Sequence, residues 1–351
     1  MSLDELQTGA VPVVPERRRG PILRALLSRN SALAALIVAL VVGVSVVNPH
    51  FAAVANIGVL ASQVATLGIP AVGMTLLIIA GYVDLSIGSM FSMVAVFATM
   101  VASGLGLLPA VIFAVVFGAA VGLLNGALVW RIPISPLIVT LGGLTFYQGV
   151  VNVVTQGQGV NDFEPGFQAL GAGAVLFGIP NPVVIFTVIA VLAGIYLART
   201  TGGLDLIAIG GNRESAEAVG IPVRRVVLGL FAANGAIIGV AAVITASNFG
   251  GASPSVGTGL ELSVLTAVIL GGVSFSGGEG NVLGTVLAVI LLTVINSGIV
   301  ALDIDSYYSN VIRGALLVFA VALDQLTEEG RDRFRRILAM RSAAAQAASR
   351  P

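Results

Sequence analysis

Residues 108–130 read LPAVIFAVVFGAAVGLLNGALVW, a run of 23 residues without a charged side chain, and Arg131 follows it directly. A bilayer core about 30 Å thick is crossed by roughly 20 apolar residues in an α-helix. The run is therefore long enough to span a membrane. Gly118, Gly122 and Gly126 recur within it at four-residue spacing, which favours close packing against a second helix.

Other apolar stretches along the chain have the same character, so the sequence predicts an all-α fold with about ten transmembrane helices. Their expected positions are 31–47, 57–80, 86–103, 108–130, 136–155, 182–198, 226–248, 262–275, 282–300 and 308–325.

The basic residues lie on one side of these predicted spans. All 17 are arginine, and 16 of them fall in alternate gaps, while Arg313 lies inside the last span. Cytoplasmic loops retain Lys and Arg. The sequence therefore predicts a polytopic membrane protein with both termini in the cytoplasm. Cytoplasmic tails at 1–30 and 326–351 would flank a transmembrane domain at 31–325.

The first predicted span has a second interpretation as a signal peptide, because arginines precede it and the small residues Ala53-Val54-Ala55 follow it. The polar leader is long for that role, and cleavage would disturb the count of ten spans. An uncleaved span is therefore favoured.

Composition excludes several kinds of chemistry. Hydrophobic residues make up 57% of the chain and charged residues 10%, against roughly 25% charged residues in soluble proteins. The absence of cysteine rules out disulfides and thiolate metal sites. With no lysine, the chain cannot form a Walker phosphate-binding loop. Any ATP it uses must be bound by another polypeptide. His50 is the single histidine, and no His, Cys or Lys lies inside a span, which argues against an enzyme.

Two glycine-rich segments interrupt the apolar pattern, at 80–89 and at 270–278. When shifted by 190 positions they share Gly81 with Gly271 and Ser86 with Ser276, which indicates at most a weak internal repeat. Asp84 lies in the first segment. It is interpreted as the N-cap of a helix beginning at Leu85 or Ser86, with direct contact to a solute as the alternative.

Polar residues inside spans are candidates for a solute pathway. Uncharged amides and hydroxyls suit a neutral polyol better than an ion, although they also hydrogen-bond neighbouring helices. The candidates are Asp84, Ser86, Asn125, Thr140, Gln148, Asn234, Thr266 and Ser274.

Arg313 lies about one turn into the last predicted span. A structural ion pair with Asp303, Asp305 or Glu261 is favoured over contact with a solute. The side chain also has the length to reach the outer surface.

The longest internal loop, 200–225, contains signals for a short helix. Asn212 is a good N-cap, Glu214 suits the first turn, and Gly220 with Pro222 ends the helix after about two turns. So short a helix is marginal by itself in water. It is expected to dock on a partner, and a solvated connector is the alternative.

Several motifs occur together in a recognisable order. They are AVGMTLLIIAGYVDLSIGS at 71–89, LNG at 124–126, ISPLIVTLGG at 134–143, AIGGNRESAEAVGI at 208–221, GGVSFSGGEGNVLGT at 271–285 and YYSNVIRGALLVFAVALD at 307–324. Over residues 50–325 the chain resembles the ABC transporter permeases of the ribose, xylose and arabinose type. Tyr82 departs from the pattern, because the family usually has glycine there.

The resemblance implies a permease in the bacterial inner membrane that works by alternating access. Its implied partners are a second permease subunit, an ATPase with two fused nucleotide-binding halves, a periplasmic sugar-binding protein and membrane lipid, with no nucleic acid. ATP and magnesium would be bound by the ATPase, and this chain would carry no cofactor. Loop 156–181 would receive the binding protein. The coupling residues would be Gly211, Asn212, Arg213, Glu214, Ala218, Gly220 and Ile221.

Two alternatives stay open from the residues alone. One keeps the ABC architecture with another cargo, such as a nucleoside, a branched-chain amino acid or a quorum signal. The other is an ion-coupled secondary transporter, which would require a charged constellation near mid-membrane. Beyond Asp84 the chain offers little of that kind.

Overall fold

The computed structural model describes residues 29–163, 165–175, 178–305, 307–322 and 325. The predicted tails at 1–30 and 326–351 therefore lie almost wholly outside the described residues. The elements are α2 (Arg29–Val47), η2 (Pro49–Ala52), α3 (Val54–Ile79), α4 (Ile87–Leu105), α5 (Leu107–Arg131), α6 (Pro136–Thr155), β1 (Val160–Asn161), α7 (Pro165–Gly171), α8 (Asn181–Arg199), α9 (Thr201–Gly211), α10 (Arg213–Ala218), α11 (Val223–Phe249), β2 (Gly251–Ala252), α12 (Leu260–Leu270) and α13 (Val282–Ala301).

The protein is a polytopic membrane protein built from helices. Eight described helices are long and apolar enough to cross a bilayer: α2, α3, α4, α5, α6, α8, α11 and α13. Two more predicted spans correspond to shorter apolar helices, α12 and the helix Tyr307–Ala322. In the described part of the chain, β structure is confined to an antiparallel ladder of two residues per strand between β1 and β2 and one isolated bridge.

Helix α12 is shorter than the predicted span 262–275. It ends at Leu270 because Gly271 and Gly272 follow, and Gly272 has a φ of 96°. Eleven residues rise about 17 Å, roughly half of a bilayer core. The apolar pattern could not reveal this, because Val273 and Phe275 continue it beyond the end of the helix.

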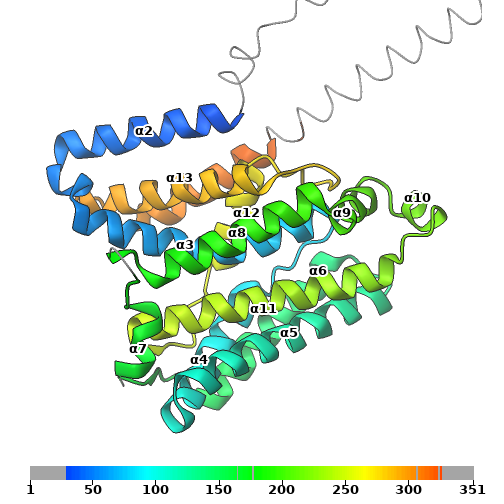
Figure 1. The fold of residues 1–351 in the computed structure, drawn as a ribbon, viewed down its shortest axis with the longest axis horizontal. Helices are drawn as coiled ribbons and strands as arrows, with labels where there is room; N and C mark the ends of the chain where they lie inside the picture. The colour runs from blue at the N-terminus through cyan, green and yellow to red at the C-terminus, as the bar shows by residue number, and fades with distance from the viewer. Residues whose placement is uncertain (1–28, 164, 176–177, 306, 323–324, 326–351) are drawn as a thin grey trace, which may run out of the picture.

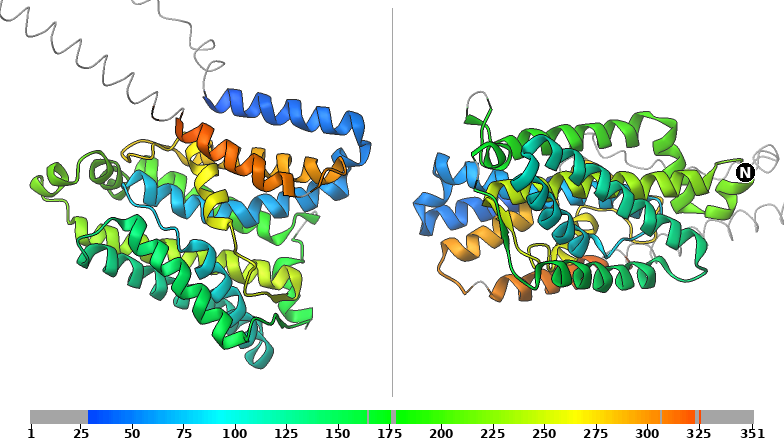
Figure 2. Two further views of the ribbon diagram at one scale, coloured as in Figure 1. Left: turned by 180° about the vertical axis from the view of Figure 1, so that it is seen from behind. Right: turned by 90° about the horizontal axis from the view of Figure 1, so that it is seen from below.

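The long helices lie side by side, and their connections collect at two ends of the bundle (Figure 1). Helices α9 and α10 lie at one end, and α7 lies at the other. The most buried long helices are α3, α4, α11 and α13, whereas α2 and α6 are the least buried. In both further views the helix Tyr307–Ala322 runs beside α13 along one edge of the bundle (Figure 2).

The glycine spacing on α5 produces the close packing that the sequence predicted. A Cβ on Gly118 would lie 2.3 Å from the carbonyl oxygen of Gly235, and one on Gly122 would lie 2.2 Å from that of Phe231. Any larger side chain would push α5 away from α11.

Two helices begin after an irregular segment that enters the bundle. Residues 80–86 lead to α4, and residues 250–259 lead from α11 to α12. The two starts meet, since the Gly257 N–H donates to Ser92 Oγ at 2.8 Å and a Cβ on Gly257 would lie 2.0 Å from the Gly88 carbonyl. Non-helical backbone is tolerated at this depth because protein surrounds it.

Candidate functional site

A buried hydrogen-bond network lies at the start of α4. Asp84 Oδ1 accepts from Ser86 N at 2.9 Å and from Ser86 Oγ at 2.6 Å. Asn125 Nδ2 on α5 donates to Asp84 Oδ2 at 3.1 Å and to Ser86 Oγ at 2.8 Å. Tyr147 on α6 donates to Asn125 Oδ1 at 2.5 Å. Three of the eight predicted pathway residues therefore come together, and the hydrogen bonds occupy both oxygens of Asp84.

The interpretation of Asp84 as an N-cap needs a correction of position. Helix α4 begins at Ile87, and Ser86 is its N-cap without a side-chain capping bond. Asp84 accepts instead from the backbone N–H two residues on, as in an Asx turn. It still accepts a hydrogen bond from a backbone N–H at the start of a helix, and through Asn125 it also joins α4 to α5.

The other predicted pathway residues do not join this network. Thr140 and Thr266 hydrogen-bond carbonyls of their own helices, and Gln148 donates to Pro254 O at 3.0 Å. Ser274 is buried in the loop before α13. Asn234 on α11 is 1% exposed, and neither polar atom of its amide has a hydrogen-bond partner among the described residues.

The end that carries α10 shows the short helix that the sequence predicted. Asn212 Oδ1 accepts from Ser215 N at 2.8 Å, and the chain leaves the helix through Gly220, which has a φ of 90°. Arg213 Nε forms an ion pair with Glu217 Oε1 at 3.0 Å, and its guanidinium lies 4.5 Å from the centre of the Trp130 ring.

Tyr82, the residue that departs from the family pattern, contacts this end. Its hydroxyl interacts with the Arg213 guanidinium, and its ring meets that of Phe231 edge to face, with centroids 6.1 Å apart. Burial raises the pKa of Tyr82, and the nearby Arg213 opposes that rise. The segment before α4 is thereby linked to α10 by a side chain whose contact with that helix the sequence did not predict.

Glycines form a second link to this end. The Gly278 N–H, in the loop before α13, donates to Ile79 O at the end of α3 at 2.8 Å. Gly210 of α9 fits against this hydrogen bond, since a Cβ there would lie 1.9 Å from Ile79 O and 2.5 Å from Gly278 N. Helix α9, which leads to α10, therefore touches the backbone of both interrupted regions.

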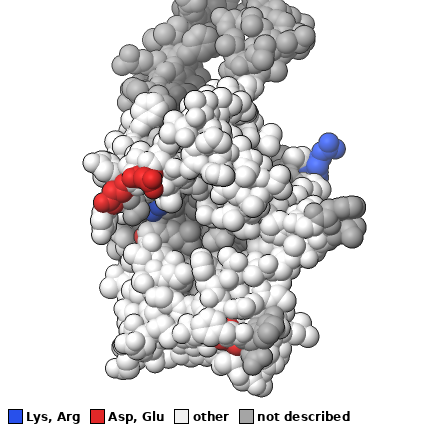
Figure 3. Space-filling view, turned by 90° about the vertical axis from the view of Figure 1, so that its left-hand side faces the viewer, with Lys and Arg blue, Asp and Glu red and all other residues white. Residues whose placement is uncertain are grey.

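The opposite end of the molecule is hollowed by a groove of about 920 Å³ between α3, α13 and the helix Tyr307–Ala322. Figure 3 looks onto this face, where acidic side chains gather at one edge of a hollow that has a basic group inside it. Amides and hydroxyls are prominent in the lining of the groove. The polar lining residues are Asn48, His50, Asn56, Gln63, Asn296, Ser297, Ser309, Asn310 and Arg313.

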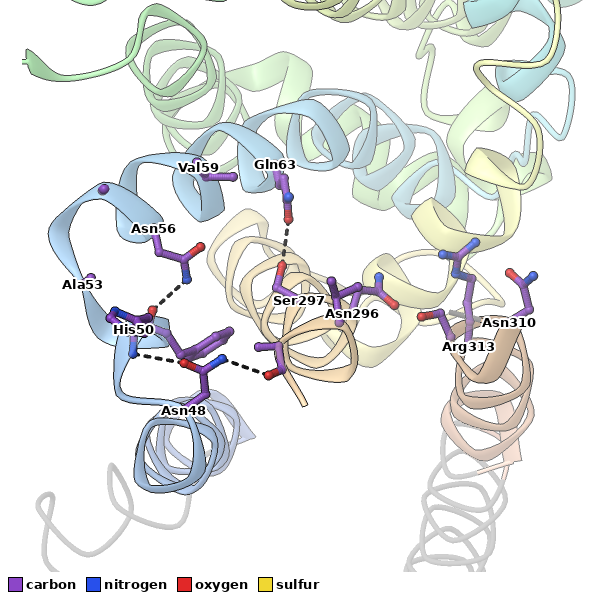
Figure 4. Close-up of a pocket in the computed structure, with 15 residues that line it drawn as sticks. Asn48, His50, Ala53, Asn56, Val59, Gln63, Asn296, Ser297, Asn310 and Arg313 are labelled. Atoms are coloured by element: carbon purple, nitrogen blue, oxygen red, sulfur yellow. Dashed lines mark hydrogen bonds between the residues drawn. The ribbon is translucent and has the colours of Figure 1, made fainter. Parts of the chain in front are cut away.

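Arg313 does not form the salt bridge that the sequence predicted. In the described part of the chain the only pair at salt-bridge distance is that of Arg213 with Glu217. Glu261 attracts Arg313 over a longer distance, and Asp303 and Asp305 are exposed on the turn before the helix. Arg313 instead lines the groove (Figure 4).

Sequence reasoning missed most of the groove. Gln63 and Asn296 are 233 positions apart, and each is an isolated amide in an apolar helix. Tyr147 was missed for the same reason. A polar residue at one helix position carries no information about which other helix it faces.

A bundle of apolar helices with two interrupted segments, a polar groove at one end and a short capped helix at the other defines a membrane permease. The chain belongs to the family described as branched-chain amino acid transport system / permease component, which matches residues 56–321. It is thus the permease component of an ABC transporter. The permease is the transmembrane subunit and not the catalytic subunit.

Sugar permeases are among the relatives of this chain. It is 33% identical to the L-arabinose ABC transporter permease protein AraH of Azospirillum brasilense, over 89% of this chain and 92% of that protein. It is 36% identical to the ribose import permease protein RbsC of Bacillus subtilis, over 82% and 89%. With the D-allose transport system permease protein AlsC of Escherichia coli it shares 32% identity over 71% and 77%.

Proposed function

We propose that this chain is the permease subunit of an ATP-driven importer that moves a monosaccharide-like solute from a periplasmic binding protein into the cytoplasm. The observation that carries the proposal is α10, a capped helix of six residues that lies at one end of the bundle (Figure 1). A helix so short is marginal by itself in water. Five of its six residues are exposed, which suits insertion into a partner.

The proposed orientation places this end in the cytoplasm of a bacterium, with the chain in the inner membrane. Arg131 and Arg199 end α5 and α8, and Arg224 with Arg225 begins α11, which contacts α10. Retention of arginine on the cytoplasmic side supports this orientation. Ten crossings with both termini inside follow if α12 and the helix Tyr307–Ala322 complete two further passes.

The proposed complex contains a second permease subunit, an ATPase with two fused nucleotide-binding halves and a periplasmic sugar-binding protein. The surface offered to the ATPase consists of Gly211, Asn212, Arg213, Glu214, Ala218, Gly220 and Ile221. Loop 156–181, which holds β1 and α7 at the opposite end, would receive the binding protein.

The contacts suggest how movement of α10 would reach the membrane. ATP-driven closure of the partner would displace α10 together with α9. Gly210 would transmit the shift to Ile79 and Gly278, and Arg213 would transmit it to Tyr82. Both interrupted regions would then change position together, which alternating access requires.

The proposed cargo is a neutral sugar. The relatives are named for L-arabinose, ribose and D-allose. Among the described residues that line the groove, Arg313 has the only permanent charge, whereas a zwitterionic amino acid would call for both signs. Another neutral solute transported by the same architecture remains the alternative.

Coupling is tested with Glu214→Arg in a complex reconstituted with its ATPase and binding protein. Glu214 is exposed in the first turn of α10, and reversing its charge opposes both the helix dipole and a complementary partner surface. Misplaced charge at an interface costs several kcal/mol, so we expect uptake of labelled sugar and stimulated ATP hydrolysis to fall about tenfold or more.

The matched control is Ser103→Arg, which adds an arginine at an exposed position in the last turn of α4. It should leave both activities within about twofold, because surface substitutions usually have small effects. Unchanged uptake and unchanged ATP hydrolysis in Glu214→Arg would remove the coupling assignment.

A further inference from the structure

A second, smaller pocket shares three lining residues with the outer groove. The groove measures about 920 Å³ and the smaller pocket about 190 Å³. Both are lined by Gln63 of α3, Asn296 of α13 and Arg313 of the helix Tyr307–Ala322. These three residues, called the neck below, therefore lie at the boundary that the two cavities share, and each comes from a different helix (Figure 4).

The neck has hydrogen-bonding capacity that the described protein does not use. Neither the Asn296 amide nor the Arg313 guanidinium makes a hydrogen bond to a described residue, and Gln63 Oε1 accepts one from Ser297 at 2.8 Å. Asn48 and Asn56 line the same groove, but their amides bond backbone groups. Asn48 donates to Ala301 O at the end of α13 and accepts from His50 N, and Asn56 donates to Phe51 O. Within one groove, the amides of Asn48 and Asn56 are thus bonded to the backbone, whereas the amide of Asn296 has no bond to a described residue.

The charge around the neck favours a neutral solute. Glu261 attracts Arg313 from α12 and partly offsets its positive charge. Asp303 and Asp305 are exposed in the turn between α13 and the following helix, near the groove residues Ala301 and Ser309. An anion would be repelled by these carboxylates, whereas hydroxyl groups can accept from guanidinium N–H donors and donate to amide oxygens.

The smaller pocket indicates the size of the solute. Beside the neck it is lined by Ser263, Thr293, Leu67 and Leu292, a mixture of hydroxyl and apolar groups. Such a mixture matches a sugar ring, which has hydroxyl edges and apolar faces. Sites for larger ligands run from about 300 to 1,000 Å³, so a pocket of 190 Å³ suits a single ring.

We infer that the neck formed by Gln63, Asn296 and Arg313 is a recognition site for a neutral polyhydroxylated solute of monosaccharide size, occupied on its way inward. This inference rests on the proposed function. It adds that the permease itself selects by size and charge at a defined place, because the neck residues line both a wide groove and a pocket that suits a single ring.

The first test uses the absence of cysteine, since one introduced cysteine is then the only thiol in the chain. Gln63→Cys and Asn296→Cys are labelled from the outer face of membrane vesicles with an impermeant thiol reagent. D-Ribose or L-arabinose should slow labelling about threefold at a concentration of about twice its Kd. The labelling rate is divided by one plus the ratio of sugar concentration to Kd. Sucrose, with two rings, should not protect.

Ser103→Cys supplies the matched control, because Ser103 is exposed in the last turn of α4 and lines neither the groove nor the smaller pocket. Its labelling rate should be the same with and without sugar. Equal rates with and without monosaccharide at both positions 63 and 296, or equal protection by sucrose, would overturn the inference.

The second test measures transport. Asn296→Leu and Arg313→Gln should lower monosaccharide uptake about tenfold while ATP hydrolysis stimulated by the loaded binding protein stays within about twofold, because hydrogen bonds to a bound solute are lost and α10 is untouched. Thr187→Val on α8, whose hydroxyl bonds its own helix at 2.7 Å, is the polar-to-apolar control.

The two proposals fail in different ways. Normal uptake by both neck variants, with a wild-type chain that imports monosaccharides, would remove the neck and leave the proposed function standing. A wild-type complex that imports no monosaccharide at all would remove both.

Discussion

Helices α4 and α12 begin with the same pattern, Asp84-Leu85-Ser86 before one and Glu261-Leu262-Ser263 in the first turn of the other. Each pattern places an acid and a serine where a helix begins inside the protein, a position at which negative charge is stabilised. The two acids nevertheless have opposite surroundings.

Asp84 is fully buried, and Ser86 and Asn125 bond it from two directions. Glu261 is partly exposed, its carboxylate lies against Gly88, and it attracts Arg313, which lines the groove. One helix start is thus locked to its neighbours, whereas Ser263 of the other lines the smaller pocket beside the neck. The two starts touch at Gly88 and Gly257, so we expect movement of one to affect the other.

The largest effect is expected from Asn125→Leu. The substitution removes the amide that bonds Asp84, Ser86 and Tyr147, and it leaves a buried carboxylate with fewer donors. Breaking a buried charged contact costs about 3 kcal/mol or more. The apparent unfolding temperature of the purified protein in detergent should therefore fall by several degrees or more.

Ser263→Ala is the control on the α12 side. The Ser263 hydroxyl donates to Gly259 O of its own chain segment at 2.8 Å, so its loss should cost less than about 1 kcal/mol. If Ser263→Ala and Asn125→Leu lowered the unfolding temperature equally, the distinction between a locked and an open helix start would be wrong.

A smaller effect is expected from Gly210→Ala, which tests how the interrupted segments 80–89 and 270–278 communicate with α10. The added Cβ would meet Ile79 O and Gly278 N, and overpacking of this kind costs about 2 kcal/mol. We expect sugar uptake to fall more than the basal ATP hydrolysis of the reconstituted complex. Gly194→Ala on α8, where nothing lies within 4 Å, should change neither activity. Equal uptake by the two variants would contradict the proposed transmission.

The smallest effect is expected from Tyr82→Phe, which keeps the ring contact with Phe231 and removes the hydroxyl near Arg213. A single hydrogen bond contributes about 1 kcal/mol, so uptake should fall roughly threefold to fivefold, and the unfolding temperature should fall by no more than a few degrees. Arg213→Gln should cause a similar loss, and the double variant should lose little more than either single one. Additive losses would show that the two side chains act independently.

Much of the fold was predictable because a lipid bilayer requires long apolar helices in the chain that crosses it. Apolar runs located the eight long helices, and Asn212 with Gly220 located the ends of α10. The short helix α12 was wrongly lengthened, because hydropathy does not register the positive φ of Gly272.

The site was predictable in part. Asp84 at a span edge and Ser86 and Asn125 within spans were recognised as candidate polar groups, but nothing in the sequence showed that they bond one another. Comparison of 81–88 with 271–278 also missed the relation of Asp84 to Glu261, since Glu261 lies before the compared segment and Asp84 falls opposite Ser274. The groove depends on which helices become neighbours, and that is decided by packing.

Arg29, the first residue of α2, donates from Nη2 to Ile269 O at 2.7 Å and from Nε to Leu270 O at 3.1 Å, and so covers the carbonyl end of α12. The two partners are 240 positions apart. During synthesis, α12 therefore emerges long after the guanidinium that finishes it has been inserted. The first described helix therefore carries the cap of a helix that is made much later, and a chimera without Arg29 would lose these two donors to the last carbonyls of α12.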